Sequence, residues 1–186
     1  MHLGRQTLVR HARPARLAAV LALALSSCAA PPADPAAHAA ADASFARLAA
    51  LQGEWVDVDG AMVPRGEMLV TYKVSAAGSA VVETLFPGQE HEMITVYTRE
   101  GQDLVLTHYC ALGNQPRMRA TRLGGDVLQF EFDGGAGIDP ARDEHMHSGR
   151  IEFVSADELR TEWQGWSGGA PVADHKVGLH LARKPD

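Results

Sequence analysis

A regular alternation of β-prone runs and turn signals, from Glu54 almost to the C-terminus, constrains the fold of this chain most. Ten runs of five to nine residues are rich in Val, Ile, Leu, Thr and aromatic residues, and Gly, Pro, Asn or Asp stands between most of them. Short strands at this spacing are typical of antiparallel sandwiches and barrels. The expected strands are residues 54–58, 67–74, 79–86, 91–98, 103–110, 117–123, 127–133, 147–154, 159–165 and 174–182.

The expected hairpin 117–133 favours a barrel, because its charges indicate a register in which one face is exposed to solvent and the other is buried. A three-residue loop pairs Arg119 with Glu131 and Arg117 with Asp133, which are opposite charges. A two-residue loop would set Arg119 against an aromatic side chain. The three-residue register also collects an apolar set on the other face: Met118, Ala120, Phe130 and Phe132. We therefore predict an all-β fold, a closed antiparallel up-and-down barrel of about ten strands with one short N-terminal helix.

Residues 1–27 have the parts of a bacterial lipoprotein signal peptide. A basic region with four arginines precedes residues 17–25, an apolar run of nine that is too short to span a bilayer. The following Leu25-Ser-Ser-Cys28 resembles a lipobox, in which Cys28 is lipidated and becomes the new N-terminus. Ala29 after the cysteine resembles lipoproteins sorted to the outer membrane. We expect a periplasm-facing lipoprotein of the cell envelope; an ordinary secretory signal or a short anchor helix is the alternative.

Removal of residues 1–27 leaves 159 residues, the size of one domain. That part has 13 basic and 23 acidic residues, a net charge of −10. An acidic domain without a Lys/Arg cluster argues against nucleic acid and against an anionic bilayer surface as partners. The membrane contact we expect is through the N-terminal lipid only.

Residues 28–41 are rich in Ala and Pro and are predicted to be a tether, so that the domain comprises residues 42–186. Asp42 or Ser44 is the expected N-cap of the short helix. Phe45, Leu48 and Leu51 then share one face of that helix, which is expected to end at Gly53.

The motif Leu51-Gln-Gly-Glu-Trp55 at the first strand is similar to the Gly-x-Trp opening of calycins, the superfamily of lipocalins and fatty-acid-binding proteins. The resemblance implies that Trp55 closes one barrel end beneath a basic residue of the last strand, a role that Arg183 could fill. In its number of strands, ten, the expected barrel resembles those of fatty-acid-binding proteins and the haem-carrying nitrobindins more than those of true lipocalins. The spacing resembles bacterial calycin-like lipoproteins of the DUF1579 type.

The expected hairpin 91–110 carries the first candidate site residues. Leu104, Leu106, His108 and Cys110 share one face, which we predict to be the inner face. An odd-length turn adds Glu92, Ile94 and Val96 to this face, whereas an even-length turn adds His91, Met93 and Thr95. Burial of Ile94 and Val96 beside the leucines favours the odd-length turn, and Glu92 is therefore a candidate ligand-binding residue.

A second pair of candidates, His145 and His147, shares a face with Ile151 and Phe153 if the strand runs through Gly149. The next strand offers Leu159, Thr161 and Trp163 to the same side. Because all inner faces of a closed barrel look into one lumen, we expect His108, Cys110, His145 and His147 to converge there, with Trp163 beside them.

Three functions remain open on these residues. The favoured one is a lipid-anchored protein that binds a small, mostly apolar ligand through this polar set. The second is a metal-binding protein or a metal-dependent or thiol enzyme, because two to three imidazoles and a thiolate suit Zn²⁺ or copper and Cys110 with a nearby histidine is a nucleophile-base pair. The third is an accessory lipoprotein with a filled barrel. Haem bound through His175 is the least favoured cofactor.

Overall fold

The computed structural model describes residues 34–185 of the 186-residue chain. The predicted signal peptide, the lipidation residue Cys28 and the first part of the predicted tether lie outside the described residues. Within residues 34–185, no helix combines the length and the apolar character needed to cross a membrane.

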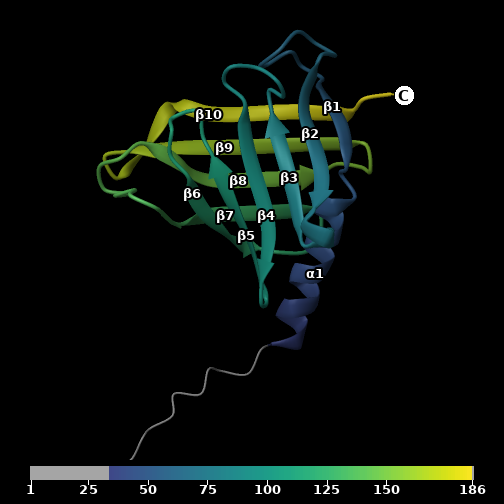
Figure 1. Cartoon of the computed structure of the whole chain (residues 1–186), viewed down its shortest axis with the longest axis horizontal. Coiled ribbons are helices and arrows are strands. Elements are labelled where there is room, and N and C mark those ends of the chain that lie inside the picture. Colours follow the sequence, from purple (N-terminus) through teal and green to yellow (C-terminus); the bar gives the residue numbers. More distant parts are fainter. Residues whose placement is uncertain (1–33, 186) are drawn as a thin grey trace, which may run out of the picture. The chain divides into compact units, whose positions relative to one another are not determined.

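Ten antiparallel strands of the described region close into a barrel, each strand paired with its neighbours in sequence and β1 paired with β10 (Figure 1). This confirms the predicted fold class. The elements are α1 (Pro35–Ala49), β1 (Gly53–Asp57), β2 (Met68–Ser75), the 3₁₀ turn η1 (Ala76–Gly78), β3 (Ala80–Leu85), β4 (Met93–Glu100), β5 (Asp103–Tyr109), β6 (Pro116–Arg122), β7 (Val127–Gly135), β8 (His145–Phe153), β9 (Glu158–Ser167) and β10 (Ala170–Arg183).

The charge-based register of the β6–β7 hairpin is confirmed. Arg119 pairs with Glu131, and Met118 pairs with Phe132 on the inner face. A bulge moves Arg117 opposite Gly134, yet Arg117 still forms an ion pair with Asp133 at 3.2 Å.

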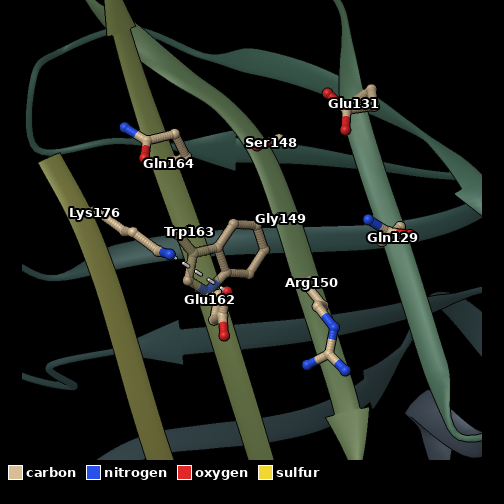
Figure 2. Close-up of a pocket in the computed structure, with 9 residues that line it drawn as sticks. All are labelled: Gln129, Glu131, Ser148, Gly149, Arg150, Glu162, Trp163, Gln164 and Lys176. Atoms are coloured by element: carbon tan, nitrogen blue, oxygen red, sulfur yellow. Dashed lines mark ion pairs between the residues drawn. The ribbon is translucent and has the colours of Figure 1, made fainter. Parts of the chain in front are cut away.

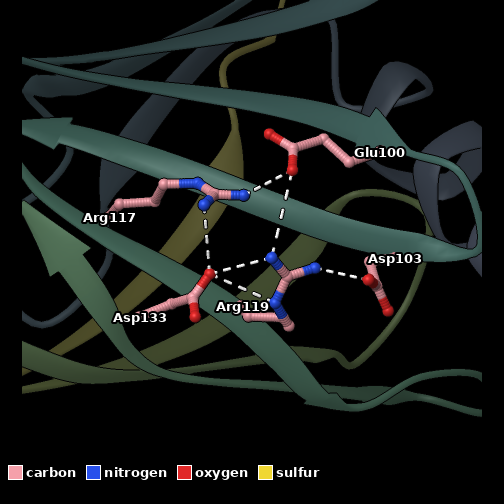
Figure 3. A network of polar contacts seen from close by, with 5 residues as sticks. All are labelled: Glu100, Asp103, Arg117, Arg119 and Asp133. Carbon is pink, nitrogen blue, oxygen red and sulfur yellow. Dashed lines mark hydrogen bonds and ion pairs between the residues drawn. The ribbon is translucent and has the colours of Figure 1, made fainter. Parts of the chain in front are cut away.

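Arg117 and Arg119 lie within a five-residue ion-pair network on the outer face of β4 to β7 (Figure 3). Arg119 contacts Asp133 at 2.9 Å and also Asp103, while Arg117 contacts Glu100 at 2.5 Å. These side chains are between 31% and 52% exposed, so water screens the pairs. The network connects four strands, and each of its exposed pairs contributes little stability.

The helix begins earlier than we predicted, because Asp34 rather than Asp42 or Ser44 is its N-cap. The Asp34 side chain accepts a hydrogen bond from the backbone N–H of Ala36 at 2.9 Å, and Pro35 occupies the first turn. Alanine is the best helix former, and Ala41 is fully buried. Residues 35–41, which we predicted to be tether, therefore form the first half of α1.

α1 covers the barrel end at which β4 turns into β5 and β6 turns into β7 (Figure 1). Phe45, Leu48 and Leu51 pack into the core from this end. Arg47 forms an ion pair with Asp126 at 3.0 Å, and Ser44 accepts a hydrogen bond from the backbone N–H of Gly124 at 3.1 Å. We call this the helix end of the barrel; the opposite end, formed by the loops 58–67, 86–92, 110–115, 136–144 and 168–169, is the mouth.

Candidate functional site

The barrel interior is filled at the helix end and hollow toward the mouth. At the helix end, large apolar side chains that are almost fully buried pack together: Leu48, Trp55, Leu104, Leu128, Ile151 and Leu159. Toward the mouth lies a cavity of about 70 Å³, which we call the lumen cavity. It is lined by Met62, Val70, Tyr72, Glu83, Leu85, Met93, Thr95, His108, Met146, Thr161, Trp163, Val177, Leu179 and Leu181.

The mouth loop 58–67 reaches this cavity because Asp57 holds its backbone. The two carboxylate oxygens of Asp57 accept hydrogen bonds from the backbone N–H groups of Asp59, Gly60, Met62 and Val63. Burial alone would raise the pKa of Asp57, but these four donors outweigh it and lower the pKa. The turn places Met62, which is 41% exposed, between the lumen cavity and solvent.

One wall of the lumen cavity carries a buried carboxyl group, Glu83 of β3. The Tyr97 hydroxyl donates a hydrogen bond to Glu83 Oε2 at 2.8 Å, and Tyr72 and Thr95 lie opposite Glu83 on the two neighbouring strands. Burial raises the pKa of Glu83, and the hydroxyls of these three residues oppose that shift. The same burial and the Glu83 charge raise the pKa of both tyrosines, which stay protonated as donors.

His108 of β5 continues this polar wall. Its Nδ1 lies 3.0 Å from Thr95 Oγ1. Its Nε2 is buried without a hydrogen-bond partner among the described residues. Burial lowers the pKa of His108 to about 4, so the ring is neutral at physiological pH. The Trp163 ring lies nearly parallel to it, with a centroid separation of 6.4 Å.

Thr161 of β9 is the other unpaired group of the cavity. Its side chain is 3% exposed, and among residues 34–185 its hydroxyl has no hydrogen-bond partner. Most of the remaining lining is aliphatic or methionine. The lumen cavity is therefore an apolar chamber with one polar wall and two buried atoms that are free to bond a guest.

Glu92 is not part of this site, which corrects our prediction. Glu100 pairs with Asp103, so the β4–β5 turn has an even length and the residues on the inner face are Met93, Thr95 and Tyr97. Glu92 is exposed and accepts a hydrogen bond from the backbone N–H of Gly88 at 2.6 Å. The even register is favoured because it brings Tyr97 and Thr95 to Glu83, the carboxyl group that our sequence reasoning missed.

Trp163 lies in the lumen wall because Gly149 leaves room for it. Gly149 pairs with Trp163 across β8 and β9, and a Cβ atom on Gly149 would lie 2.3 Å from the indole ring. Figure 2 shows the indole of Trp163 reaching from β9 toward Gly149 of β8. A side chain at position 149 would therefore displace the ring.

Cys110 and His145 lie closer to the mouth than His108. Both line a separate, more open depression together with Glu144 and His175. Burial raises the pKa of the Cys110 thiol, and the nearby Glu144 charge adds to the rise, so the protonated thiol is a weak nucleophile. His145 is fully buried; its Nδ1 bonds the Asp143 carbonyl at 2.8 Å.

His147 does not share a face with Ile151 and Phe153, because a β-bulge between Met146 and Ser148 breaks the alternation. Met146 takes the place in the lumen wall. The His147 ring stacks on Trp166 at 3.8 Å, and its Nδ1 lies 3.0 Å from His145 Nε2. The neighbouring His145 and burial lower the pKa of His147, with burial the larger cause.

The four predicted residues therefore do not converge in one cavity. His108 lines the lumen cavity, Cys110 and His145 line the mouth depression, and His147 is stacked at the bulge. In the described part of the chain, no group of three or more His, Cys, Asp or Glu side chains is placed to hold a metal ion.

A further depression, of about 220 Å³, lies on the outer face of β7 to β10 (Figure 2). Its rim carries charged and amide side chains, including Glu131, Arg150 and Gln164, and Lys176 lies 3.8 Å from Glu162. It is larger than the lumen cavity but shallow and solvent-screened. We regard the lumen cavity as the candidate site, because buried unpaired polar atoms occur there.

Trp55 and Arg183 lie together at the helix end of the barrel. The Arg183 guanidinium lies 4.7 Å from the centre of the Trp55 ring and donates to the carbonyls of Gln52 and Ala50 at 2.9 and 3.1 Å. Comparison of the chain with protein-family models finds no match, and comparison with curated proteins finds none either.

Proposed function

We propose that this chain is a lipid-anchored protein of the bacterial cell envelope that binds a small, mostly apolar molecule in the lumen cavity. One observation carries the binding function: within a barrel whose helix end is filled, the mouth half keeps a cavity with two buried polar atoms that have no partner among residues 34–185. Leaving such atoms unpaired costs stability, and a protein without a guest gains nothing from them.

The architecture supports the same function. α1 covers one end, so a guest enters from the mouth, where Met62 stands over the cavity. Met62, Met93 and Met146 are flexible thioethers that can adapt the cavity to a guest. A closed ten-stranded barrel in which Arg183 lies over Trp55 is consistent with a calycin, and we propose a calycin-like origin on this basis.

A lumen-filling substitution tests the binding function. We expect Val177→Phe to abolish the binding of both phenol and toluene, because Val177 lines the cavity and the larger ring occupies its space. Val154→Phe is the matched control, since Val154 is 46% exposed and lies outside the cavity. Binding to the purified full chain is measured by the shift in melting temperature on adding each probe. Equal shifts in wild type and Val177→Phe would refute binding in the lumen.

The anchor is tested separately through Cys28. Because lipidation needs the cysteine sulfur, we expect Cys28→Ser to shift the protein from the membrane fraction to the soluble fraction or to leave it unprocessed. Ser27→Ala keeps a small residue before the cysteine and serves as control. Mass spectrometry of the native protein that finds an unmodified Cys28 would refute the anchor without affecting the binding proposal.

A further inference from the structure

We infer that the lumen ligand is a small neutral alcohol or phenol, whose hydroxyl group donates a hydrogen bond to His108 Nε2 and bonds the Thr161 hydroxyl. This inference rests on the proposed binding function and specifies its ligand class. It follows from the directions of the hydrogen bonds on the polar wall, from the count of free donors and acceptors, and from the size of the cavity.

The polar wall indicates which nitrogen of His108 carries the proton. Glu83 accepts a hydrogen bond from the Tyr97 hydroxyl, and Thr95 lies directly opposite Glu83 across β3 and β4. In the proposed arrangement the proton of the Thr95 hydroxyl points to the Glu83 carboxylate, which can only accept. The Thr95 oxygen then accepts a hydrogen bond from His108 Nδ1–H at 3.0 Å. In a neutral ring the other nitrogen is an acceptor. His108 Nε2 therefore presents a lone pair and requires a donor from the ligand.

The free groups of the cavity match one hydroxyl group. His108 Nε2 offers an acceptor, and the Thr161 hydroxyl offers one donor with acceptor capacity. A ligand hydroxyl has one proton to donate and lone pairs to accept, so it complements both protein atoms, which line the same cavity. An ammonium group carries three N–H donors and no acceptor, so it would leave the proton of the Thr161 hydroxyl unpaired.

Charge excludes the anionic alternative. The ionisable groups that line the cavity are Glu83, Tyr72 and His108, and within residues 34–185 its lining contains no Lys or Arg. A carboxylate or phosphate ligand would meet Glu83 and the lone pair of a neutral imidazole, with the Thr161 hydroxyl as its one free donor. Such a ligand would lose its hydration without compensation.

Size and shape restrict the apolar part of the ligand. The cavity of about 70 Å³ is well below the roughly 300–1,000 Å³ of pockets for drug-sized ligands. Its walls are mainly aliphatic, with the flat face of Trp163 beside His108. A single ring or a short chain that bears one hydroxyl fits this description, and the flexible methionine side chains can move to accommodate it.

Four probes of similar size separate the outcomes, and the binding of each is measured at pH 8. Phenol donates and accepts, anisole accepts only, toluene does neither, and benzylamine is a cation. We expect phenol to bind the full-length protein on the order of ten-fold or more tightly than each of the others, because only phenol satisfies both buried atoms. Equal affinity for phenol and toluene would mean that water molecules hydrogen-bond these two protein atoms. Tighter binding of anisole would mean that His108 Nε2 donates a hydrogen bond instead of accepting one, and tighter binding of benzylamine would mean that the ligand is a cation. Each result overturns the inference and leaves lumen binding intact, whereas loss of all binding refutes the proposed function.

Two substitutions locate the preference. Thr161→Val and His108→Phe should each reduce the phenol-over-toluene preference several-fold, while Thr98→Val, on the side of β4 away from the cavity, should leave it unchanged. Thr161→Val should also melt no lower than wild type, since it removes an unpaired hydroxyl and keeps the side-chain shape. An unchanged preference in Thr161→Val would overturn the assignment even if His108→Phe failed to fold.

Discussion

Trp55→Ala is expected to lower the free energy of unfolding by about 3–5 kcal/mol, the range for truncation of a large buried aromatic side chain. Trp55 is fully buried, and its Nε1–H donates to the Leu51 carbonyl at 2.8 Å. Its loss would remove the support of Arg183, which connects the end of α1 with the loop that carries Asp157. It would also leave a cavity against Tyr72, whose ring packs edge-on at 6.1 Å.

Denaturant unfolding of the full chain measures this effect, and Trp166→Ala is the matched control. Trp166 is partly exposed and stacks on His147 near the mouth, so its truncation should cost less. A loss below about 1 kcal/mol for Trp55→Ala would show that Trp55 does not close the helix end.

The second large effect is a loss of stability on acidification that depends on His108. Its pKa falls from 6.5 to about 4 in the folded protein. Between these values the unfolded chain binds a proton that the folded protein does not, so stability falls as pH falls through this window. A depression of this size corresponds to about 3 kcal/mol lost between pH 6.5 and pH 4.

Comparison with His108→Phe isolates the His108 contribution. The pKa of Glu83 is raised by burial, so Glu83 acts in the opposite direction and weakens the fold as pH rises above its unfolded value. Glu83 is present in both proteins, and its effect largely cancels in the difference. Unfolding free energies measured from pH 4 to pH 7 should fall more steeply toward acid in wild type. Parallel curves would contradict a buried neutral imidazole.

The alternation of apolar and polar residues along each strand, together with the pairing of opposite charges across one hairpin, was sufficient to predict the barrel. Each of the ten strands was predicted, and the pairing of Arg119 with Glu131 followed from the charges of one hairpin. The start of α1 was missed because its burial depends on contact with the barrel end. The alanines of residues 35–41 have high helix propensity, but nothing in that segment alone indicates that Ala41 becomes buried.

The site was harder to predict because it depends on one turn and one bulge. A one-residue change in the β4–β5 turn exchanges Glu92, Ile94 and Val96 for Met93, Thr95 and Tyr97 on the inner face. The inserted residue at the β8 bulge turns His147 away from the face of Ile151. The sequence does contain an indication of the role of Glu83, because Glu83 lies between Val81 and Leu85 on one face of a strand. A carboxyl group on an otherwise apolar strand face indicates a functional or buried polar site.

Intermolecular nuclear Overhauser contacts between phenol and the full-length protein test the central claim, binding within the lumen cavity, most directly. If phenol binds there, its ring protons will contact the methyl groups of Met93 and Met146 and the indole of Trp163, all of which line the cavity. These contacts should vanish in Val177→Phe and persist in Val154→Phe. Contacts with Gln129 and Lys176 of the outer depression instead, or none with the two methionines at saturating phenol, would contradict the account.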